Sequence, residues 1–438
     1  MISNGVMILR RLFRMLSAFA AMSLSLAAVP AFAADPMAVT TTPTVVPVVA
    51  RAASDRDRAR MNQRVFDRVW SEVRTQYYDP GLHGVDWNAA RRTWRPLALA
   101  APDDRTLYRA LGDMLDLLDD DHSGAAPPAV ARRQDTQRQR RAAIGVSLRP
   151  EPSGDAYLIE QVRPDSPAAE AGVAAGWRLI TGTGAQWTPE QDIAEGQSVT
   201  LALIDGEGVA RSLTLTPRMM EPTPAFVADG SRPGVLVLTV DGFEVGLGRW
   251  MGAQLAGLSP ETDVVIDLRG NPGGRLAEAD AVLSCFLPRD QLWASRTGRS
   301  GRRVDLRTAG GCGDLDQPVG NDVAVLVDAN SRSAAELTPA ALQEARRAVV
   351  VGAPTAGAVL ISQETRLPDG GRLNLSRADF VTSGGVRLEK RGVAPDVAAP
   401  LTPEDRRAGR DPGLEAAVAA LAGSRVEPVM AVQAVPAI

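Results

Sequence analysis

One stretch of the sequence, residues 323–336, most constrains how this chain can fold. An apolar run at 323–327 is typical of a buried strand, and residues 336–348 repeat apolar side chains at helical spacing. A polar turn containing Ser331 and Ser333 joins the two. Serine at the start of a helix is a common cap for free backbone N–H groups. The same position, at the positive end of the helix dipole, also suits a nucleophile whose reaction forms an oxyanion.

Further alternation of apolar runs with helical patterns predicts a layered α/β domain over residues 222–400. Strands are expected at 235–240, 263–268, 323–327 and 348–351, and helices at 248–258, 276–287 and 334–346. Residues 401–438 are expected to hold a last helix at 412–422 and a tail. The core of the protein is therefore predicted to lie in the C-terminal half of the chain.

Two smaller regions are expected before this domain. Residues 54–135 read as helical, and residues 142–217 as rich in short strands with a small helix that begins at Ser166. The helices of the first region are expected at 54–78, 86–97 and 104–118, with Asp86 and Asp104 as N-caps. The strands of the second are expected at 144–148, 157–162, 199–204 and 212–216. The whole pattern predicts an α+β multidomain protein.

The first residues of the chain have the features of a secretory signal peptide. Three arginines precede a short apolar run at 16–29, and Ala31-Phe-Ala33 fits a small-x-small cleavage site. Residues 1–33 are therefore predicted to be removed, and residues 34–53, rich in Ala, Val, Thr and Pro, to form a linker. We expect an exported, periplasmic protein with no stable membrane insertion after cleavage.

Composition excludes several kinds of function. A net charge of −4 gives no reason to expect nucleic-acid binding. The two histidines and two cysteines are widely separated, which disfavours a zinc site, so no metal or cofactor is predicted. In an oxidising compartment Cys285 and Cys312 either form a disulfide or remain two separate buried thiols. The sequence does not distinguish these two states, and it predicts no oligomeric state.

Three motifs in order resemble the C-terminal processing peptidases, also called tail-specific proteases, and their relatives around the tricorn protease core. They are Asp267-Leu-Arg-Gly-Asn-Pro-Gly-Gly274, Ser331-Arg-Ser-Ala-Ala-Glu336 and Gly392-Val-Ala-Pro-Asp396. The resemblance implies a crotonase-like βα layered protease core at 222–400 that acts on protein or peptide substrates. It also implies a PDZ-like domain at 142–217, with Ile144-Gly145-Val146 as the peptide-binding loop.

The resemblance identifies Ser333 as the nucleophile. A glycine loop after a strand exposes backbone N–H groups without obstruction by side chains. The N–H of Gly273 or Gly274, with that of Ala334, is therefore predicted to form an oxyanion hole.

One position departs from the family pattern. Most tail-specific proteases pair the serine with a lysine, and Ala358 stands at that position here. The tricorn-like relatives instead imply His122 as the base, whereas His83 lies in a glycine-containing loop and reads as a surface residue. Glu389 matches the acidic residue of those relatives as the group that orients the imidazole, and Asp121 is a second candidate.

Two functions remain open on the sequence. The first is an exported serine endopeptidase with Ser333 as nucleophile and His122 as base. The second is a catalytically inactive peptide-binding scaffold of the cell envelope, favoured by Ala358. A third possibility, a purely structural or assembly role in the envelope, has no characteristic sequence motif that could support it.

Overall fold

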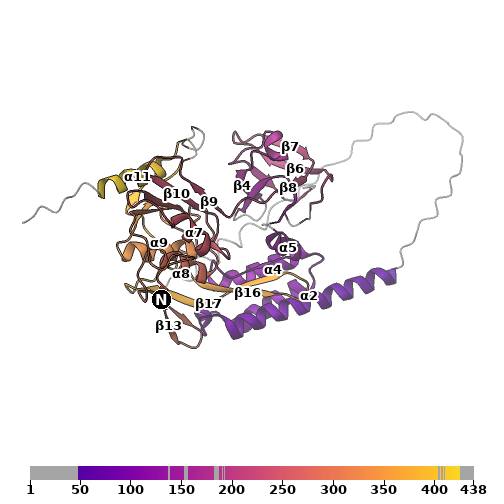
Figure 1. The fold of residues 1–438 in the computed structure, drawn as a ribbon. Helices are drawn as coiled ribbons and strands as arrows, with labels where there is room; N and C mark the ends of the chain where they lie inside the picture. Colours follow the sequence, from indigo (N-terminus) through magenta and orange to yellow (C-terminus); the bar gives the residue numbers. More distant parts are fainter. Residues whose placement is uncertain are drawn as a thin grey trace, which may run out of the picture. The chain divides into compact units, whose positions relative to one another are not determined.

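The computed structural model describes residues 48–424, apart from 137–138, 152–155, 182–186, 190, 192, 403–404, 406–407 and 409. The expected signal peptide, residues 34–47 of the expected linker and the tail after residue 424 lie outside the described residues. Within the described part of the chain, no helix is both long and apolar enough to cross a membrane. The architecture is a mixed α/β multidomain one, as the sequence predicts (Figure 1).

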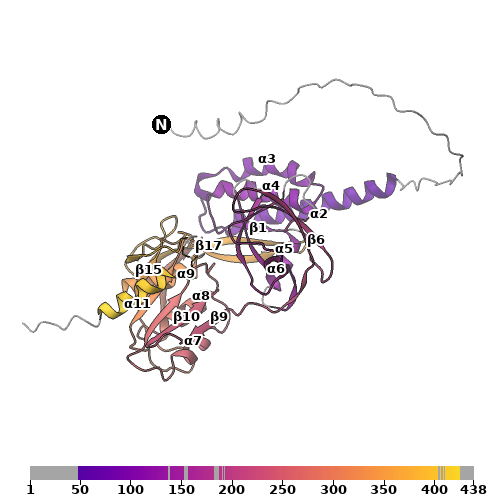
Figure 2. The same cartoon turned by 90° about the horizontal axis from the view of Figure 1, so that it is seen from above.

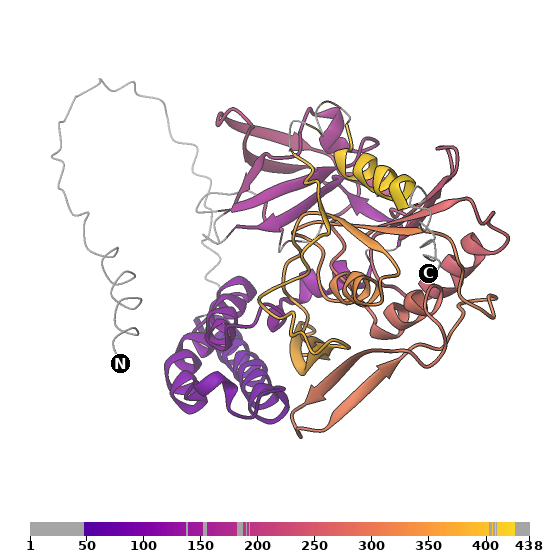
Figure 3. The same cartoon turned by 90° about the vertical axis from the view of Figure 1, so that its left-hand side faces the viewer.

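The N-terminal region is helical. Its helices are α2 (Val48–Gln76), α3 (Trp87–Leu99), α4 (Asp104–Leu115) and α5 (Pro128–Asp135), with short 3-10 turns at Leu82–Gly84 and Asp116–Leu118. Helices α2, α3 and α4 bury an apolar cluster that includes Phe66, Tyr77 and Leu111, and they form the purple group in Figure 3. Two expectations need correction: α2 begins at Val48 and not at residue 54, and the N-cap of α4 is Asp103, whose carboxylate accepts from Thr106 N–H.

A small β-rich module follows. Its five-stranded antiparallel sheet has the order β3-β4-β5-β6-β7, and a separate pair joins β2 to β8. The strands are β2 (Arg141–Ala143), β3 (Val146–Pro150), β4 (Ala156–Val162), β5 (Arg178–Ile180), β6 (Val199–Ile204), β7 (Ala210–Leu215) and β8 (Arg218–Met220). The short helix α6 (Pro167–Glu170) is capped by Ser166, as the sequence predicts. β3 lies at one edge of the five-stranded sheet, and no strand among the described residues pairs with its outer side, where a strand could be added.

The core domain contains a six-stranded sheet of order β18-β15-β14-β11-β10-β9. Only β9 is antiparallel to its neighbour. The strands are β9 (Phe226–Asp229), β10 (Val235–Val240), β11 (Asp263–Asp267), β14 (Val323–Val327), β15 (Val349–Gly352) and β18 (Val397–Ala398). The four strands expected from the sequence are the central ones, because only strands buried on both faces read as continuous apolar runs.

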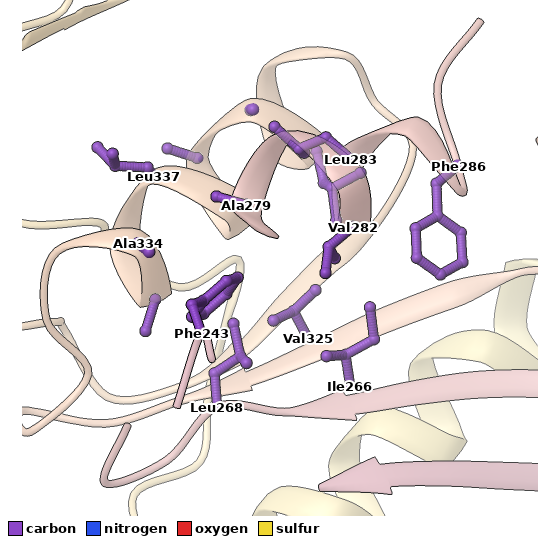
Figure 4. Close-up of a cluster of buried hydrophobic side chains, with 14 of the residues drawn as sticks. Phe243, Ile266, Leu268, Ala279, Val282, Leu283, Phe286, Val325, Ala334 and Leu337 are labelled. Atoms are coloured by element: carbon purple, nitrogen blue, oxygen red, sulfur yellow. The ribbon is translucent and has the colours of Figure 1, made fainter. Parts of the chain in front are cut away.

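Helices cover both faces of this sheet. Alternate residues of β14 divide between two apolar clusters: Val325 lies in one with residues of α7, α8 and α9, and Leu326 lies in the other with residues of α11. Figure 2 shows α11 in yellow beside β15. The helices are α7 (Leu247–Leu255), α8 (Leu276–Ser284), α9 (Ala334–Glu344) and α11 (Pro412–Ser424). Figure 4 shows Ala334 and Leu337 of α9 in one cluster with Phe243. This packing fixes the first turn of α9 near the ends of β11 and β14.

A second sheet, which the sequence does not predict, connects the core to the helical region. Its strands are β1 (Gly124–Ala126), β12 (Leu292–Gly298), β13 (Arg303–Arg307), β16 (Ile361–Arg366) and β17 (Arg372–Thr382). β17 pairs with β12 and β16 of the core and also with β1, where Gly124 is opposite Asn374. Residues just before β1 are thereby attached to the core domain.

Cys285 and Cys312 form a disulfide with a sequence separation of 27, which decides between the two states that the sequence left open. We expect the double substitution Cys285→Ser/Cys312→Ser to lower the free energy of unfolding by about 3–4 kcal/mol, because it releases a closed loop of this size in the unfolded chain. Urea unfolding of the oxidised protein and of the variant measures the difference. A loss below about 1 kcal/mol would contradict the expectation.

Candidate active site

Ser331 holds the turn between β14 and α9. Ser331 is fully buried; its Oγ donates to Leu268 O at 2.8 Å and accepts from Asp328 N at 3.0 Å. Asp328 in turn accepts from Gly270 N at 2.9 Å. Ser331 therefore ties this turn to the glycine loop after β11, and it is not available as a nucleophile.

Ser333 is the residue that precedes the first turn of α9, and its backbone is strained. Its φ is 55° and its ψ is −119°, a conformation that non-glycine residues rarely adopt. Such a conformation costs about 1–3 kcal/mol and persists only where the surroundings impose it. Here the Ser333 N–H donates to Ala358 O at 2.8 Å and to the Glu336 carboxylate at 3.1 Å. The side chain of Ser333 is half-buried at the helix N-terminus.

Glu336 binds the backbone around Ser333 and the segment 355–358, a role that was not assigned from the sequence. It is fully buried, and besides Ser333 N–H its carboxylate accepts from Thr355 Oγ1 at 2.6 Å, Gly357 N at 2.7 Å and Ala358 N at 2.9 Å. Burial raises the pKa of Glu336, and these hydrogen bonds oppose that rise. The available signal was its place three residues after Ser333, which is the spacing of a capping box.

The glycine loop after β11 lies against Ser333. Gly273 has φ of 95°, and a Cβ added to it would lie 2.6 Å from Ser333 Cβ and 3.0 Å from Ala334 N. Its N–H donates to Asn271 Oδ1 at 2.7 Å, and Asn271 is itself anchored on Val240 O at 2.8 Å. Within the described part of the chain, the N–H groups of Gly274 and Ala334 donate no hydrogen bond. Of the two glycines left open by the sequence, Gly274 is therefore the free donor.

His122 is placed by the second sheet. It lies in the loop before β1, where its N–H donates to Asp120 Oδ1 at 2.8 Å and its carbonyl accepts from Asn374 Nδ2 at 2.8 Å. Ser376 N–H donates to Ser123 Oγ at 3.1 Å, so two residues of β17 hold this loop. The sequence could not reveal this link, because the partners are about 250 residues apart.

The electrostatic surroundings of His122 favour its neutral form. Burial lowers the pKa of the imidazole, Asp120 and Asp121 oppose this, and Arg332 and Lys390 lower the pKa further. Arg332 is the residue before Ser333, so the imidazole lies within electrostatic reach of the Ser333 turn. His122 Nδ1 is buried without a hydrogen-bond partner among the described residues. Ser333 and His122, both described, are not hydrogen-bonded to each other in this structure.

Glu389 and Asp121, the two candidates for orienting His122, have different surroundings. Glu389 is buried; its Oε2 accepts from Val359 N at 2.9 Å, while its Oε1 has no partner among the described residues. Burial, with help from Asp120, raises the pKa of Glu389. Asp121 is exposed and binds Lys390 Nζ at 3.0 Å. Among the described residues, Glu389 therefore has a buried oxygen that is free to accept, whereas Asp121 is exposed and its Oδ2 is engaged by Lys390.

No lysine lies at the family's lysine position. Ala358 is buried, and both its backbone polar groups are used by Glu336 and Ser333. Lys390, the only lysine in the sequence, lies between Asp121 and Asp119. Burial lowers the pKa of Lys390, but the two carboxylates outweigh it and the pKa is raised overall. An ammonium held in this way is a poor proton acceptor.

Outside this site, the histidine and acidic residues that the structure describes suggest no second catalytic or metal site. His83 bonds Tyr78 Oη and Leu118 O, each at 2.8 Å, and about a third of its side chain is exposed. Among the residues that the structure describes, no group of His, Cys, Asp and Glu has the arrangement of a metal site.

The expected peptide-binding loop, Ile144-Gly145-Val146, borders a cavity of about 1060 Å³. Gly145 has φ of 84°, and an added Cβ would lie 2.0 Å from Ser166 Cβ, so only glycine fits. The edge strand β3 contributes Ser147 and Leu148 to the same cavity. This arrangement offers one free strand edge beside apolar side chains.

The pH dependence of any peptidase activity follows from these surroundings. A histidine base must be neutral to accept a proton, so if His122 is that base, activity is present above its pKa and is lost as the pH falls through it. Since that pKa is lowered from 6.5, we expect activity to persist below pH 6.5. The kcat/KM of the free enzyme, measured from pH 4 to 9, should show its acidic limb below 6.5. A limb near the ordinary range of lysine would contradict this expectation.

Sequence comparison agrees with this geometry. Residues 234–399 match the model of peptidase family S41, and residues 47–116 match the tricorn protease C1 domain. Residues 234–399 are therefore a peptidase family S41 domain, and residues 47–116 a tricorn protease C1 domain.

Individual relatives cover most of the chain. A carboxyl-terminal-processing protease of Synechocystis is 26% identical over 351 residues, which span 76% of this chain and 80% of that protein. A carboxy-terminal-processing protease of Bartonella bacilliformis is 27% identical over 370 residues, spanning 79% and 77%. The solved photosystem II D1 C-terminal processing protease shares the fold with a TM-score of 0.55 and 22% identity, over 77% of this chain and 93% of that one.

Proposed function

We propose that this chain is a serine endopeptidase of the tail-specific type, with Ser333 as nucleophile and His122 as base. The observation that carries the proposal is the strained Ser333 at the start of α9, beside the free N–H groups of Gly274 and Ala334. A strained residue next to unpaired backbone donors is typical of an acyl-transfer site. An ordinary helix cap needs neither the strain nor the adjoining glycine loop.

In the proposed mechanism Ser333 Oγ attacks the carbonyl carbon of the scissile peptide bond while His122 takes the hydroxyl proton. The negative charge that develops on the carbonyl oxygen is stabilised by Gly274 and Ala334 N–H. The imidazolium then protonates the leaving amine, and water hydrolyses the acyl-enzyme with His122 again as base. Glu389, through its free Oε1, orients the imidazole and stabilises its cation.

Residues 142–217 are proposed to act as a PDZ-like substrate-binding domain. A peptide would add to the free edge of β3 and place its side chains in the cavity beside Ile144 and Val146. We further propose that the core at 222–400 has crotonase-like layering, which is supported by the parallel strands β10, β11, β14 and β15.

We also propose that the protein acts after export. The disulfide between Cys285 and Cys312 supports an oxidising compartment. The charged and apolar pattern of residues 1–33 is the feature of the sequence that would direct export.

The experiment that tests the proposed function is incubation of the purified protein with an unfolded protein substrate and, separately, with a fluorophosphonate probe. We expect new peptide termini by mass spectrometry and a covalent label on Ser333, with both absent in Ser333→Ala. A label elsewhere, or cleavage that persists in Ser333→Ala, would refute the assignment.

A second function, an inactive peptide-binding scaffold, is favoured by Ala358 and by the absence of a hydrogen bond between Ser333 and His122, both described residues. In the same experiment it predicts no cleavage and no label, with peptide binding by the β3 edge retained. Fluorescence anisotropy with a labelled peptide measures that binding.

A further inference from the structure

The loop that carries Glu389 also carries Lys390, whose surroundings are unusual. Its Nζ lies 3.0 Å from Asp121 Oδ2 and 3.5 Å from Asp119 Oδ1. Its backbone N–H donates to Gly357 O at 2.7 Å. Its φ of 61° shows that the surroundings impose this backbone conformation.

These contacts join two segments that come from distant parts of the sequence. Asp119 and Asp121 belong to the loop of His122, in the helical region. Gly357 belongs to the core segment that Glu336 holds and that accepts the Ser333 N–H through Ala358 O. Lys390 thus contacts the loop of the proposed base with its side chain and the support of the nucleophile with its backbone.

Other contacts hold only part of the His122 loop. Asn374 and Ser376 of β17 bind His122 O and Ser123 Oγ, on the side toward β1. Asp120 bonds within the loop, to His122 N and to Ser123 Oγ. The part of the loop that precedes His122 contains Asp119 and Asp121. Among the described residues, these two contact the core domain through Lys390.

We infer that Lys390 is a positioning residue, whose ammonium holds the loop 119–122 against the core so that the His122 imidazole faces Ser333. The inference rests on the proposed function and adds to it a residue outside the reacting groups. The family's lysine position holds alanine in this chain, and the only lysine serves instead to place the histidine.

The exposure of these ion pairs determines what loss of Lys390 should do. The side chains of Lys390 and Asp121 are 41% and 56% exposed, so the pair contributes little to global stability. Alignment of a base is more sensitive, because a displacement of about 1 Å can cost about 10²-fold in rate. The expected signature is a fall in kcat without a comparable fall in melting temperature.

The test compares Lys390→Met, Lys390→Arg and a matched control, Arg303→Met, which removes an exposed ion pair with Asp305 on β13. We expect Lys390→Met to lower kcat about 10-fold with KM unchanged. Lys390→Arg should retain most activity, because arginine preserves the charge. Arg303→Met should behave as wild type. The double variant Asp119→Asn/Asp121→Asn should reproduce the loss in Lys390→Met.

The dependence of kcat on ionic strength is a further test, because a purely structural role of Lys390 would not make kcat depend on salt. Salt at about 0.5 M screens exposed ion pairs, so it should lower the kcat of the wild type and leave that of Lys390→Met nearly unchanged. Equal salt responses, or a Lys390→Met variant indistinguishable from Arg303→Met, would overturn the inference.

Three outcomes separate this inference from its rivals. If Lys390 were the general base, Lys390→Arg would abolish activity, since arginine does not release its proton. If cleavage persisted in Ser333→Ala or His122→Ala, the proposed function itself would fail. If those variants were inactive while Lys390→Met was fully active, the proposed function would stand and only the role of Lys390 would fall.

Discussion

Replacement of His122 by alanine is expected to lower kcat by about 10⁶-fold, the loss found when a serine peptidase loses its catalytic histidine. The reason is that Ser333 Oγ then has no neutral acceptor near it: Ala358 carries no titratable group, and Lys390 is held protonated by Asp119 and Asp121. The measurement is the cleavage rate of a fluorogenic peptide at pH 7, with circular dichroism to verify the fold.

The matched control is His83→Gln, because His83 is the other histidine in the sequence. It lies in a helix-linking loop and bonds Tyr78 and Leu118, so its loss should leave kcat close to that of the wild type. An unchanged rate in His122→Ala would rule out the histidine mechanism. A large loss in His83→Gln would show that the assay responds to general damage of the helical region.

The second large effect is expected for Gly273→Ala. The added Cβ would lie 2.6 Å from Ser333 Cβ and 2.7 Å from Arg332 O, so the glycine loop and the nucleophile must move apart. That displacement should misplace the Gly274 N–H and lower kcat by about 10²–10³-fold, as removal of one oxyanion donor does. The backbone strain at φ of 95° should also cost about 1–3 kcal/mol of stability.

Gly370→Ala separates these two effects. Gly370 has φ of 93°, and nothing lies within 4 Å of an added Cβ, so it carries the same backbone strain without the contact. We expect a similar fall in melting temperature with kcat nearly unchanged. If both variants lost activity equally, the loss in Gly273→Ala would reflect instability and not the oxyanion site.

The parts of the fold that the sequence predicted are those encoded locally. The buried parallel strands β11 and β14 read as apolar runs, and caps such as Asp86 and Ser166 lie next to the helices they begin. The second sheet was missed because β16 is mostly polar with no buried residue, and because β17 pairs with β1 and β12, which are distant in the sequence. Asp103 was missed as a cap because Asp104 beside it has the same chemistry.

In the candidate site, too, the residues within local motifs could be predicted from the sequence, and those that depend on distant contacts could not. Ser333 and the glycine loop could be proposed from motifs because each motif is a single turn of chain. The preference for Gly274 over Gly273 rests on the hydrogen bond from Gly273 to Asn271, and the preference for Glu389 over Asp121 rests on the burial of Glu389 and on its Oε1, which has no partner among the described residues. The roles of Glu336 and Lys390 depend on partners brought together only by the fold.

The most direct test of the central claim is the distance between His122 and Ser333 when the site is occupied. A crystal structure of the protein with a peptidyl boronate bound to Ser333 Oγ would give it. We expect His122 Nε2 at about 3 Å from Ser333 Oγ, with Glu389 Oε1 on the Nδ1 side. A separation beyond about 8 Å, or another side chain within hydrogen-bonding distance of Ser333 Oγ, would contradict the account.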